Sequence, residues 1–270
     1  MQNTIIASKS VKGGGLGNAG GLFHALGLSR NSAFTLAEVL ITLGIIGVVA
    51  AMTLPALVQS HTNKIVETRL AKFYSTINQA IKMSEVEYGD KKYWFTDLNN
   101  IETDEEGKPV NGSSEVEKWW NKYISPNMKT TSVKYDEKGL PYFYFPDGSA
   151  LKIRFTDAIR DWIFYPGNPD KCLKRYKTED EAHGKCSFLF IYMPGGEDIK
   201  TNASNPNAPE WKYHVNKGVE PYKYNWDGTT NSLYSNNGYS CKTGNRAFCT
   251  ALIQYNGWKI PKDYPYKVSY

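Results

Sequence analysis

One carboxylate, Glu38, lies inside the longest apolar stretch of the chain, residues 34–58, which has 25 residues and no other charge. A carboxylate near the centre of a bilayer costs on the order of 2.5–3.5 kcal/mol, so such residues tend to be partnered or functional. A simpler explanation stays open. Glu38 lies only about 6 Å along a helix that begins at residue 34, where it reaches the membrane interface and favours the positive end of the helix dipole.

The four cysteines fall into two sequence-local pairs, Cys172 with Cys186 and Cys241 with Cys249. An even number of cysteines suits disulfides in an oxidising compartment. Thirteen and seven residues intervene, which are not zinc-knuckle spacings, so a site built from four thiolates is disfavoured. Four cysteines permit three connectivities, and we predict the local one because each bond then closes a short loop.

Other reactive side chains form no catalytic pattern. His183 lies near Asp180, Glu181 and Cys186 in the sequence, which suggests a metal site, but a solvated acidic turn beside a disulfide is the better explanation. The chain has no P-loop and no defensible Ser/His/Asp order. We therefore expect no enzymatic activity, no catalytic residue, no metal site and no cofactor.

Residues 34–58 are long enough to cross a membrane as a helix, since 25 residues extend roughly 37 Å and the hydrocarbon core is about 30 Å thick. Residues 1–33 contain seven glycines, three basic residues and no acid, and we interpret them as a leader that does not fold alone. An ordinary secretory signal cleaved after Ala51 is the alternative. It is disfavoured because the basic region would be unusually long and the apolar run continues past Ala51 to Val58.

The junction between leader and span carries a more specific motif. It reads Ser32-Ala33-Phe34-Thr35-Leu36-Ala37-Glu38, and Pro55 follows 21 residues after the Phe. Over about residues 33–88, this pattern resembles the prepilin signal of type IV pilins and type II secretion pseudopilins. The resemblance implies that a membrane-embedded peptidase cuts between Ala33 and Phe34 and methylates the new amine. Ala33 stands where the family usually has Gly.

The same resemblance implies how the protein assembles. Glu38 of one subunit pairs with the Phe34 amine of its neighbour, and Pro55 occupies the position of a helix-kinking proline. The implied partners are copies of the chain and other pilins in a helical filament, the prepilin peptidase and an inner-membrane assembly platform. Major pseudopilins bind calcium in a C-terminal loop, but no recognisable spacing supports calcium among the candidate oxygens here, those of Asp198, Asn202, Asp227, Thr229 and Asn231.

The apolar pattern after Pro55 predicts that the helix continues beyond the membrane. Spacings of three and four predict one helix over residues 34–88 that stops at Gly89. We expect a leader (1–33), a transmembrane half (34–58), an amphipathic half (59–88) and a globular head (89–270). Apolar residues recur after Pro55 at Leu57, Val58, Ile65, Val66, Leu70, Phe73, Ile77, Ala80 and Ile81.

The head has the sequence pattern of an antiparallel α+β domain. Ser114 and Glu117 form a capping-box pattern that opens a short helix, and Asp147-Gly148 predicts a hairpin. Residues 195–247 lack periodicity, and we interpret them as a long surface loop. The predicted fold is α+β and pilin-like, with the long helix packed on a small sheet and a loop-rich C-terminal region. We expect strands at 132–135, 141–145, 151–155, 162–165 and 187–193.

Charge gives conflicting signals about topology. Three of the 32 basic residues and none of the 27 acidic ones lie in residues 1–33, so the rest is nearly neutral and we predict no nucleic-acid partner. Lys64, Arg69 and Lys72 follow the span, and the positive-inside rule alone would place the head in the cytoplasm. The cysteines and the leader favour an inner-membrane protein with its head outside the cytoplasm, which then joins a cell-surface or periplasmic filament.

Aromatic residues are abundant, with 19 Tyr, 7 Trp and 11 Phe. If these side chains are buried, they form the core of the head. If they are exposed, they bind glycans or a partner surface. We expect the first. The leading hypothesis is a structural subunit of a type IV pilus or type II secretion pseudopilus. The alternatives are a minor pilin or adhesin whose aromatic C-terminal region binds a ligand, and a membrane-anchored secreted enzyme.

Overall fold

The computed structural model describes residues 35–94, 100–154, 161–176, 178–195 and 209–270. The chain divides into two compact units, Met1–Val49 and Ala50–Tyr270, and we call the second the head unit. Helix α1, Leu36–Tyr88, begins in the first unit and ends in the second. Within the first unit the structure describes Thr35 and the beginning of α1.

Helix α1 confirms the predicted long helix and its predicted end. Gly89 adopts φ +74, and its N–H donates to the Glu85 carbonyl at 3.0 Å, which is a glycine helix stop. The short 3-10 helix η1, Lys91–Tyr93, follows. One stripe of α1 is buried in the head unit at helical spacing: Val66, Leu70, Phe73, Ile77, Ala80, Ile81 and Ser84.

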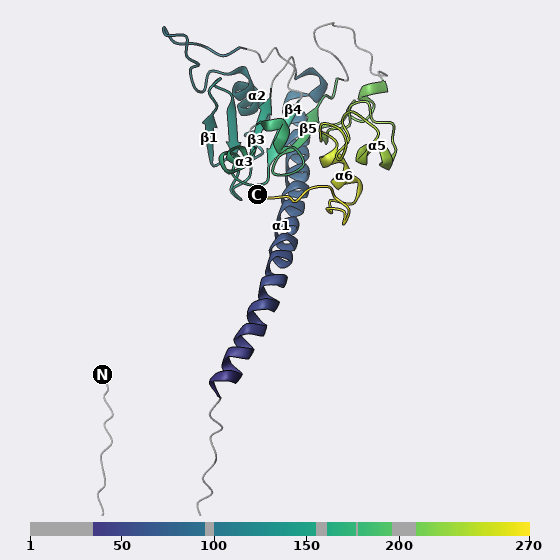
Figure 1. The fold of residues 1–270 in the computed structure, drawn as a ribbon. Helices are drawn as coiled ribbons and strands as arrows, with labels where there is room; N and C mark the ends of the chain where they lie inside the picture. Colours follow the sequence, from purple (N-terminus) through teal and green to yellow (C-terminus); the bar gives the residue numbers. More distant parts are fainter. Residues whose placement is uncertain (1–34, 95–99, 155–160, 177, 196–208) are drawn as a thin grey trace, which may run out of the picture. The chain divides into compact units, whose positions relative to one another are not determined.

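The head unit contains one antiparallel six-stranded sheet in which each strand pairs with the next along the chain (Figure 1). The predicted Asp147-Gly148 turn joins the second and third strands, and Gly148 has φ +79. The first five strands agree with the predicted strands to within a residue or two at each end. The strands are β1 Ser132–Tyr135, β2 Pro141–Tyr144, β3 Ala150–Arg154, β4 Asp161–Tyr165, β5 Phe188–Tyr192 and β6 Val219–Pro221.

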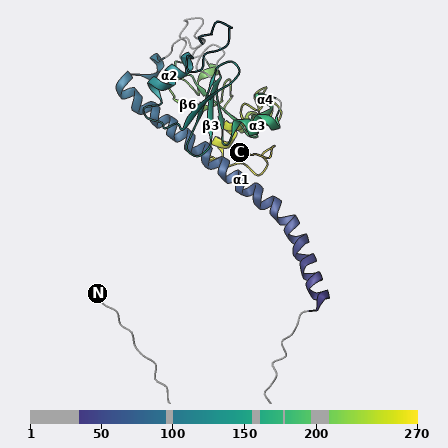
Figure 2. The ribbon, with the colours of Figure 1, turned by 90° about the vertical axis from the view of Figure 1, so that its left-hand side faces the viewer.

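Successive side chains on a strand point to opposite faces of the sheet, and both faces are covered. Trp162 and Phe164 of β4 lie in the core with α1 and α2 (Glu115–Tyr123), whereas Ile163 and Tyr165 lie in a second core. The Phe73 ring stacks on Phe164 with centroids 4.4 Å apart. On the second face the short helices α3 (Pro169–Arg175) and α4 (Glu179–Ala182) contribute to the other core. The sheet therefore lies between α1 with α2 and the α3–α4 segment (Figure 2).

The C-terminal region is more ordered than the sequence suggested. The described part of the predicted loop 195–247 contains 3-10 helix η2 (Pro209–Trp211), strand β6 and helix α5 (Thr230–Tyr234), and α6 (Cys249–Tyr255) follows. Leu233, Phe248 and Leu252 form a buried cluster of their own. The described part of this region is mostly turns, as predicted, but it is not all at the surface, because Trp211, His214, Leu233 and Cys241 are buried.

Candidate functional site

The start of α1 is closed by a reciprocal cap between Thr35 and Glu38. The Glu38 carboxylate accepts from the Thr35 N–H and from the Thr35 hydroxyl, both at 2.8 Å. The Glu38 N–H in turn donates to the Thr35 hydroxyl oxygen at 3.2 Å. This is a capping box, and its Thr-x-x-Glu spacing is a sequence signal that could have predicted it. Glu38 thus has a partner in its own chain.

The predicted processing residues Ala33 and Phe34 lie outside the described residues. The description of this site therefore begins at Thr35. A cut before Phe34 would place the new amine one residue before Thr35, next to the start of α1. The pairing of Glu38 with a neighbouring amine stays a prediction.

The apolar side chains between Leu36 and Val58 are uncovered. Leu36 is 78% exposed in the first unit and Met52 is 75% exposed in the head unit. Helix α1 is long and apolar enough to cross a membrane. A continuous apolar surface of this length requires lipid or other apolar helices to cover it. The others at least half exposed are Leu40, Ile41, Leu43, Ile45, Ile46, Val48, Val49, Leu54, Leu57 and Val58.

Pro55 lies within α1, which continues through it as one helix. Proline has no N–H, so the Ala51 carbonyl loses its usual donor four residues later. Pro55 therefore interrupts the backbone hydrogen-bond pattern of α1 near the end of the apolar stretch. A functional role for Pro55 in assembly stays a prediction.

Two of the basic residues after the span are used to dock the head onto α1. Arg69 donates to the backbone carbonyls of Pro166 and Asp147, and Lys72 pairs with the Asp147 carboxylate at 3.0 Å. These contacts join α1 to the turn between β2 and β3 and to the segment after β4. Their charges thus serve the fold, which weakens their value as a topology signal.

Both predicted disulfides are present. Cys172 bonds Cys186 across a sequence separation of 14, and Cys241 bonds Cys249 across 8. The first joins α3 to the turn before β5, and the second joins the loop after α5 to the start of α6. All four cysteines are thereby used, and the local connectivity is confirmed.

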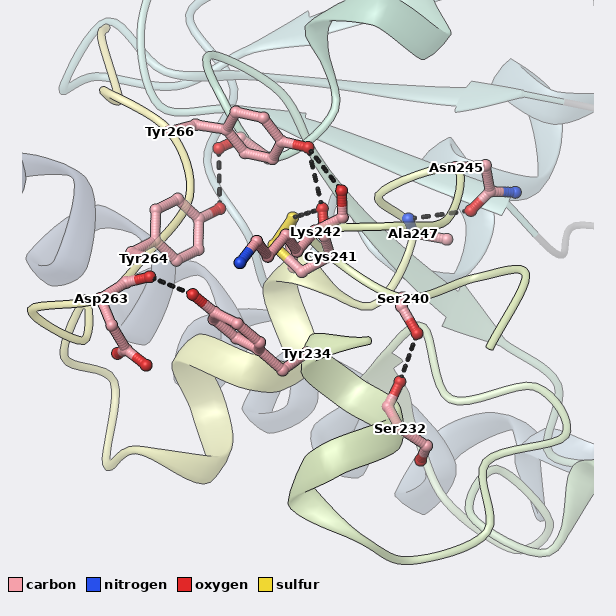
Figure 3. Close-up of a disulfide and its surroundings, with 12 residues drawn as sticks. Ser232, Tyr234, Ser240, Cys241, Lys242, Asn245, Ala247, Asp263, Tyr264 and Tyr266 are labelled. Atoms are coloured by element: carbon pink, nitrogen blue, oxygen red, sulfur yellow. Dashed lines mark hydrogen bonds between the residues drawn. A yellow bond between two sulfur atoms is a disulfide. The ribbon is translucent and has the colours of Figure 1, made fainter. Parts of the chain in front are cut away.

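Tyrosine hydroxyls fix the loop around the second disulfide (Figure 3). The Tyr266 hydroxyl donates to the Cys241 carbonyl at 3.0 Å, and the Tyr264 hydroxyl donates to the Gly184 carbonyl at 2.7 Å. The Tyr234 hydroxyl donates to the Asp263 carbonyl at 2.6 Å. Tyr264 and Tyr266 of the C-terminal segment thus contact the loops of both disulfides, and Tyr234 of α5 in turn holds the C-terminal segment.

No metal-binding cluster appears in the part of the chain that the structure describes. No group of three or more His, Cys, Asp and Glu side chains there could hold a metal ion. His183 is buried with Nδ1 3.0 Å from the Ser187 hydroxyl and Nε2 3.5 Å from Asp180, while Cys186 is in a disulfide. Of the candidate calcium ligands, Asp198 and Asn202 lie outside the described residues.

The remaining candidate calcium ligands cap a local turn. One Asp227 oxygen accepts from the Thr229 N–H at 2.8 Å, the Thr229 hydroxyl at 2.9 Å and the Ser232 hydroxyl at 2.5 Å. These hydrogen bonds hold the pKa of Asp227 below its usual value. The acceptor oxygen of Asp227 is thus used for the start of α5.

A buried histidine in the C-terminal region was missed by the sequence analysis. His214 is fully buried, its Nε2 accepts from the Lys223 N–H at 3.1 Å, and its ring lies edge-on to Trp211. Burial, with a smaller effect of the nearby Lys223 charge, lowers its pKa from 6.5 to about 3. His214 is therefore a neutral structural acceptor at physiological pH.

The aromatic residues of the C-terminal region pack mainly on one another. Trp226 lies 4.6 Å from Tyr213, and Trp211 lies 4.6 Å from Tyr224, between ring centroids. Among the described aromatic residues after Trp211, the exposed ones are Tyr255 and Tyr270. The expectation that aromatic residues form the core is confirmed for this region.

Comparisons with known proteins agree with this division of the chain. Residues 28–54 match the prokaryotic N-terminal methylation motif, and this match supports the type IV pilin-like prepilin signal at the start of α1. Residues 56–268, most of the chain, match a family of unknown function (DUF6613). Neither the curated proteins nor the solved structures contain a match. The chain is thus a type IV pilin-like protein that belongs to the family of unknown function DUF6613.

Proposed function

We propose that this protein is a structural subunit of a bacterial envelope filament, either a type IV pilus or a type II secretion pseudopilus. It is anchored in the inner membrane with its head outside the cytoplasm. Prepilin peptidase cuts between Ala33 and Phe34 and methylates Phe34. The mature chain assembles with other copies and other pilins through α1.

One observation carries this proposal. The methylation motif over residues 28–54 coincides with the exposed apolar part of α1, whose first turn holds Glu38 against Thr35. An anchor alone needs an apolar helix, but not a carboxylate in its first turn. The pilin-like class is structural, which supports a protein without enzymatic activity of its own.

The N-terminus of the mature protein tests the proposal. The full chain is expressed in a bacterial host with and without a prepilin peptidase, and its N-terminal peptide is measured by mass spectrometry. We expect loss of residues 1–33 and an N-methylated Phe34 only when the peptidase is present. A mature chain that begins at Met52, or uncleaved chain alone, would contradict the proposal.

A pair of variants controls this experiment. Ala33→Gly restores the residue usual in the family and should be cut at least as well as the wild type. Ala33→Arg places a long charged side chain beside the bond to be cut and should block processing while the chain still inserts. Cleavage of both variants at the same rate as the wild type would assign the cut to another peptidase.

A further inference from the structure

The C-terminal segment of the head unit is fastened to α1 just beyond the apolar stretch. The Gln59 amide donates to the Val268 carbonyl at 3.1 Å. Glu67 accepts from the Ile260 N–H at 2.9 Å and pairs with Lys259 at 3.1 Å. Residues 260–268 are therefore held at the level of α1 residues 59–67, and the exposed apolar side chains Leu57 and Val58 immediately precede that level.

Basic side chains gather on this edge of the head unit. Ser269 donates its N–H to the Lys185 carbonyl at 2.9 Å, and Lys171 and Arg175 of α3 line a cavity of about 100 Å³ with Ser269 and Tyr270. Figures 1 and 2 show the C-terminal segment crossing α1 at this edge, with α3 beside it. We call the following seven residues, all exposed or half-buried, the basic edge: Lys64, Lys171, Arg175, Lys185, Lys259, Lys262 and Lys267.

The basic edge carries a local excess of positive charge. Against these seven basic residues, four carboxylates lie in or beside the same stretches of chain, Glu67, Asp170, Glu181 and Asp263, and Glu67 is already paired with Lys259. Elsewhere on the head unit the segment before α2 is acidic, since Glu102, Asp104, Glu105 and Glu106 outnumber the neighbouring Lys108. The near-neutral total therefore conceals an uneven distribution of charge over the head unit.

The position of the basic edge matches a membrane surface. Glu67 follows Val58 by nine residues, which is about 14 Å along a helix. The headgroup layer adds about 5–8 Å beyond the hydrocarbon core, and charges act over a Debye length of about 8 Å at physiological ionic strength. When the apolar stretch is in the membrane, the lysines of the basic edge thus lie within reach of the headgroups.

We propose that the basic edge binds the anionic phospholipid headgroups of the membrane in which α1 is anchored. Clusters of four to eight basic residues beside a span attract anionic lipid, by roughly a fivefold gain in affinity per residue near the surface. Tyr270, whose ring lies 5.1 Å from the Arg69 guanidinium carbon, adds an aromatic side chain of the kind enriched at membrane interfaces. The proposal rests on anchoring alone and not on filament assembly.

Lysine reactivity in nanodiscs tests this proposal. The full chain is reconstituted at one copy per disc, in phosphatidylcholine or in a mixture with phosphatidylglycerol, and amine acylation is measured residue by residue by mass spectrometry. We expect Lys262 and Lys267 to react about three- to fivefold more slowly in the anionic discs, and high salt to remove the difference. Lys108 and Lys138, exposed elsewhere on the head unit, should react equally in both. Equal rates for Lys262 and Lys267 would overturn the proposal.

Two triple variants with the same change in charge provide the control. K64Q/K262Q/K267Q removes exposed lysines of the basic edge, and K82Q/K108Q/K138Q removes exposed lysines outside it. The readout is the phosphatidylglycerol recovered with the chain after detergent extraction from mixed vesicles. The first variant should lose the enrichment and the second should keep it, whereas equal retention contradicts the proposal. The acylation measurement is repeated with several copies per disc. Lysine protection that appears only there, and is the same in neutral and anionic lipid, would assign the basic edge to contacts with a second copy and overturn the proposal.

Discussion

Gly184 lies directly against the sulfur of Cys249. Gly184 has φ +73, and a Cβ built there would collide with Sγ and Cβ of Cys249. Because Gly184 is two residues from Cys186, this contact joins the loop of the first disulfide to that of the second. The two disulfide loops are thus in direct contact here, and the Tyr264 hydroxyl, which donates to the Gly184 carbonyl, packs at the same place.

We expect Gly184→Ala to lower the free energy of unfolding by about 3 kcal/mol, from the cost of a left-handed conformation and from overpacking. Gly257→Ala is the matched control, since Gly257 has φ +66 with open space around it, and should cost only about 1 kcal/mol. Denaturant unfolding of the full chain in detergent measures both. Equal losses would show that the contact with Cys249 contributes nothing.

Substitutions at Glu38 separate helix capping from charge pairing. Gln retains an acceptor for the Thr35 N–H and is a capping-box residue, whereas Leu removes both cap and charge. If Glu38 pairs with a neighbouring amine, both Glu38→Gln and Glu38→Leu should reduce sheared filaments to less than about a tenth of the wild-type level. Cleavage before Phe34 should continue in both. Normal filaments from Glu38→Gln would reduce the role of Glu38 to capping.

The disulfides should contribute measurably to stability. Replacing Cys172 and Cys186 by Ala is expected to cost about 3 kcal/mol, and replacing Cys241 and Cys249 about 2–3 kcal/mol, because each bond limits the unfolded chain. Unfolding midpoints of the two double variants, compared with the wild type, check these values. A variant with an unchanged midpoint would show that its loop is already restrained by packing.

The same cysteines report the compartment. Peptide mapping under non-reducing conditions, on protein from its native envelope, should recover the two bonded pairs, because a cytosolic head would keep its thiols reduced. Free thiols at all four positions would place the head inside the cell.

His214 should make the head unit sensitive to acid. Its pKa falls from 6.5 to about 3 on folding, so the unfolded state binds more protons between these values and stability decreases as the pH falls. Between pH 7 and pH 5 the loss is about 2 kcal/mol. The charge of Lys223 also lowers the pKa of His214. The Lys223 ammonium lies 3.5 Å from the Glu220 carboxylate.

Comparison with His214→Gln isolates this effect, because Gln keeps an acceptor for the Lys223 N–H but does not titrate. Unfolding free energies at the two pH values should differ by about 2 kcal/mol less in the variant than in the wild type. The same pH dependence in both proteins would assign the acid sensitivity to the carboxylates.

Local patterns predicted the parts of the fold that local interactions determine. Alternating strands around Asp147-Gly148, the stripe from Val66 to Ile81 and the cysteine pairs are short-range signals, and the structure confirms each. Ser114 caps α2 as predicted, since its side chain accepts from the Glu117 N–H. At the candidate site, Thr35 and Glu38 were equally local, and their cap could have been predicted from spacing alone.

Strand β6 shows why the rest was not predicted. It has three residues and includes Pro221, which is tolerated because β6 is an edge strand. Its place is fixed from a distance: the Asn78 side chain accepts from the Val219 N–H at 3.0 Å and donates to the Val219 carbonyl at 2.8 Å. The Tyr74 hydroxyl donates to Glu220 at 2.7 Å. Asn78 and Val219 are 141 positions apart, so a pattern of neighbouring residues could not predict this contact or the strand that it holds.

The contacts of α1 with Val219 and Val268 also set an order of events during synthesis. Synthesis of the apolar stretch is complete about 200 residues before Val268 is added, a delay of roughly 10–40 s at usual elongation rates. The buried stripe of α1 stays without its full set of partners during that time, because Asn78 and Gln59 bond to the last parts of the head unit. In the topology proposed above, membrane insertion of the helix would therefore precede closure of the head unit, and the nascent chain would need protection on the trans side of the membrane.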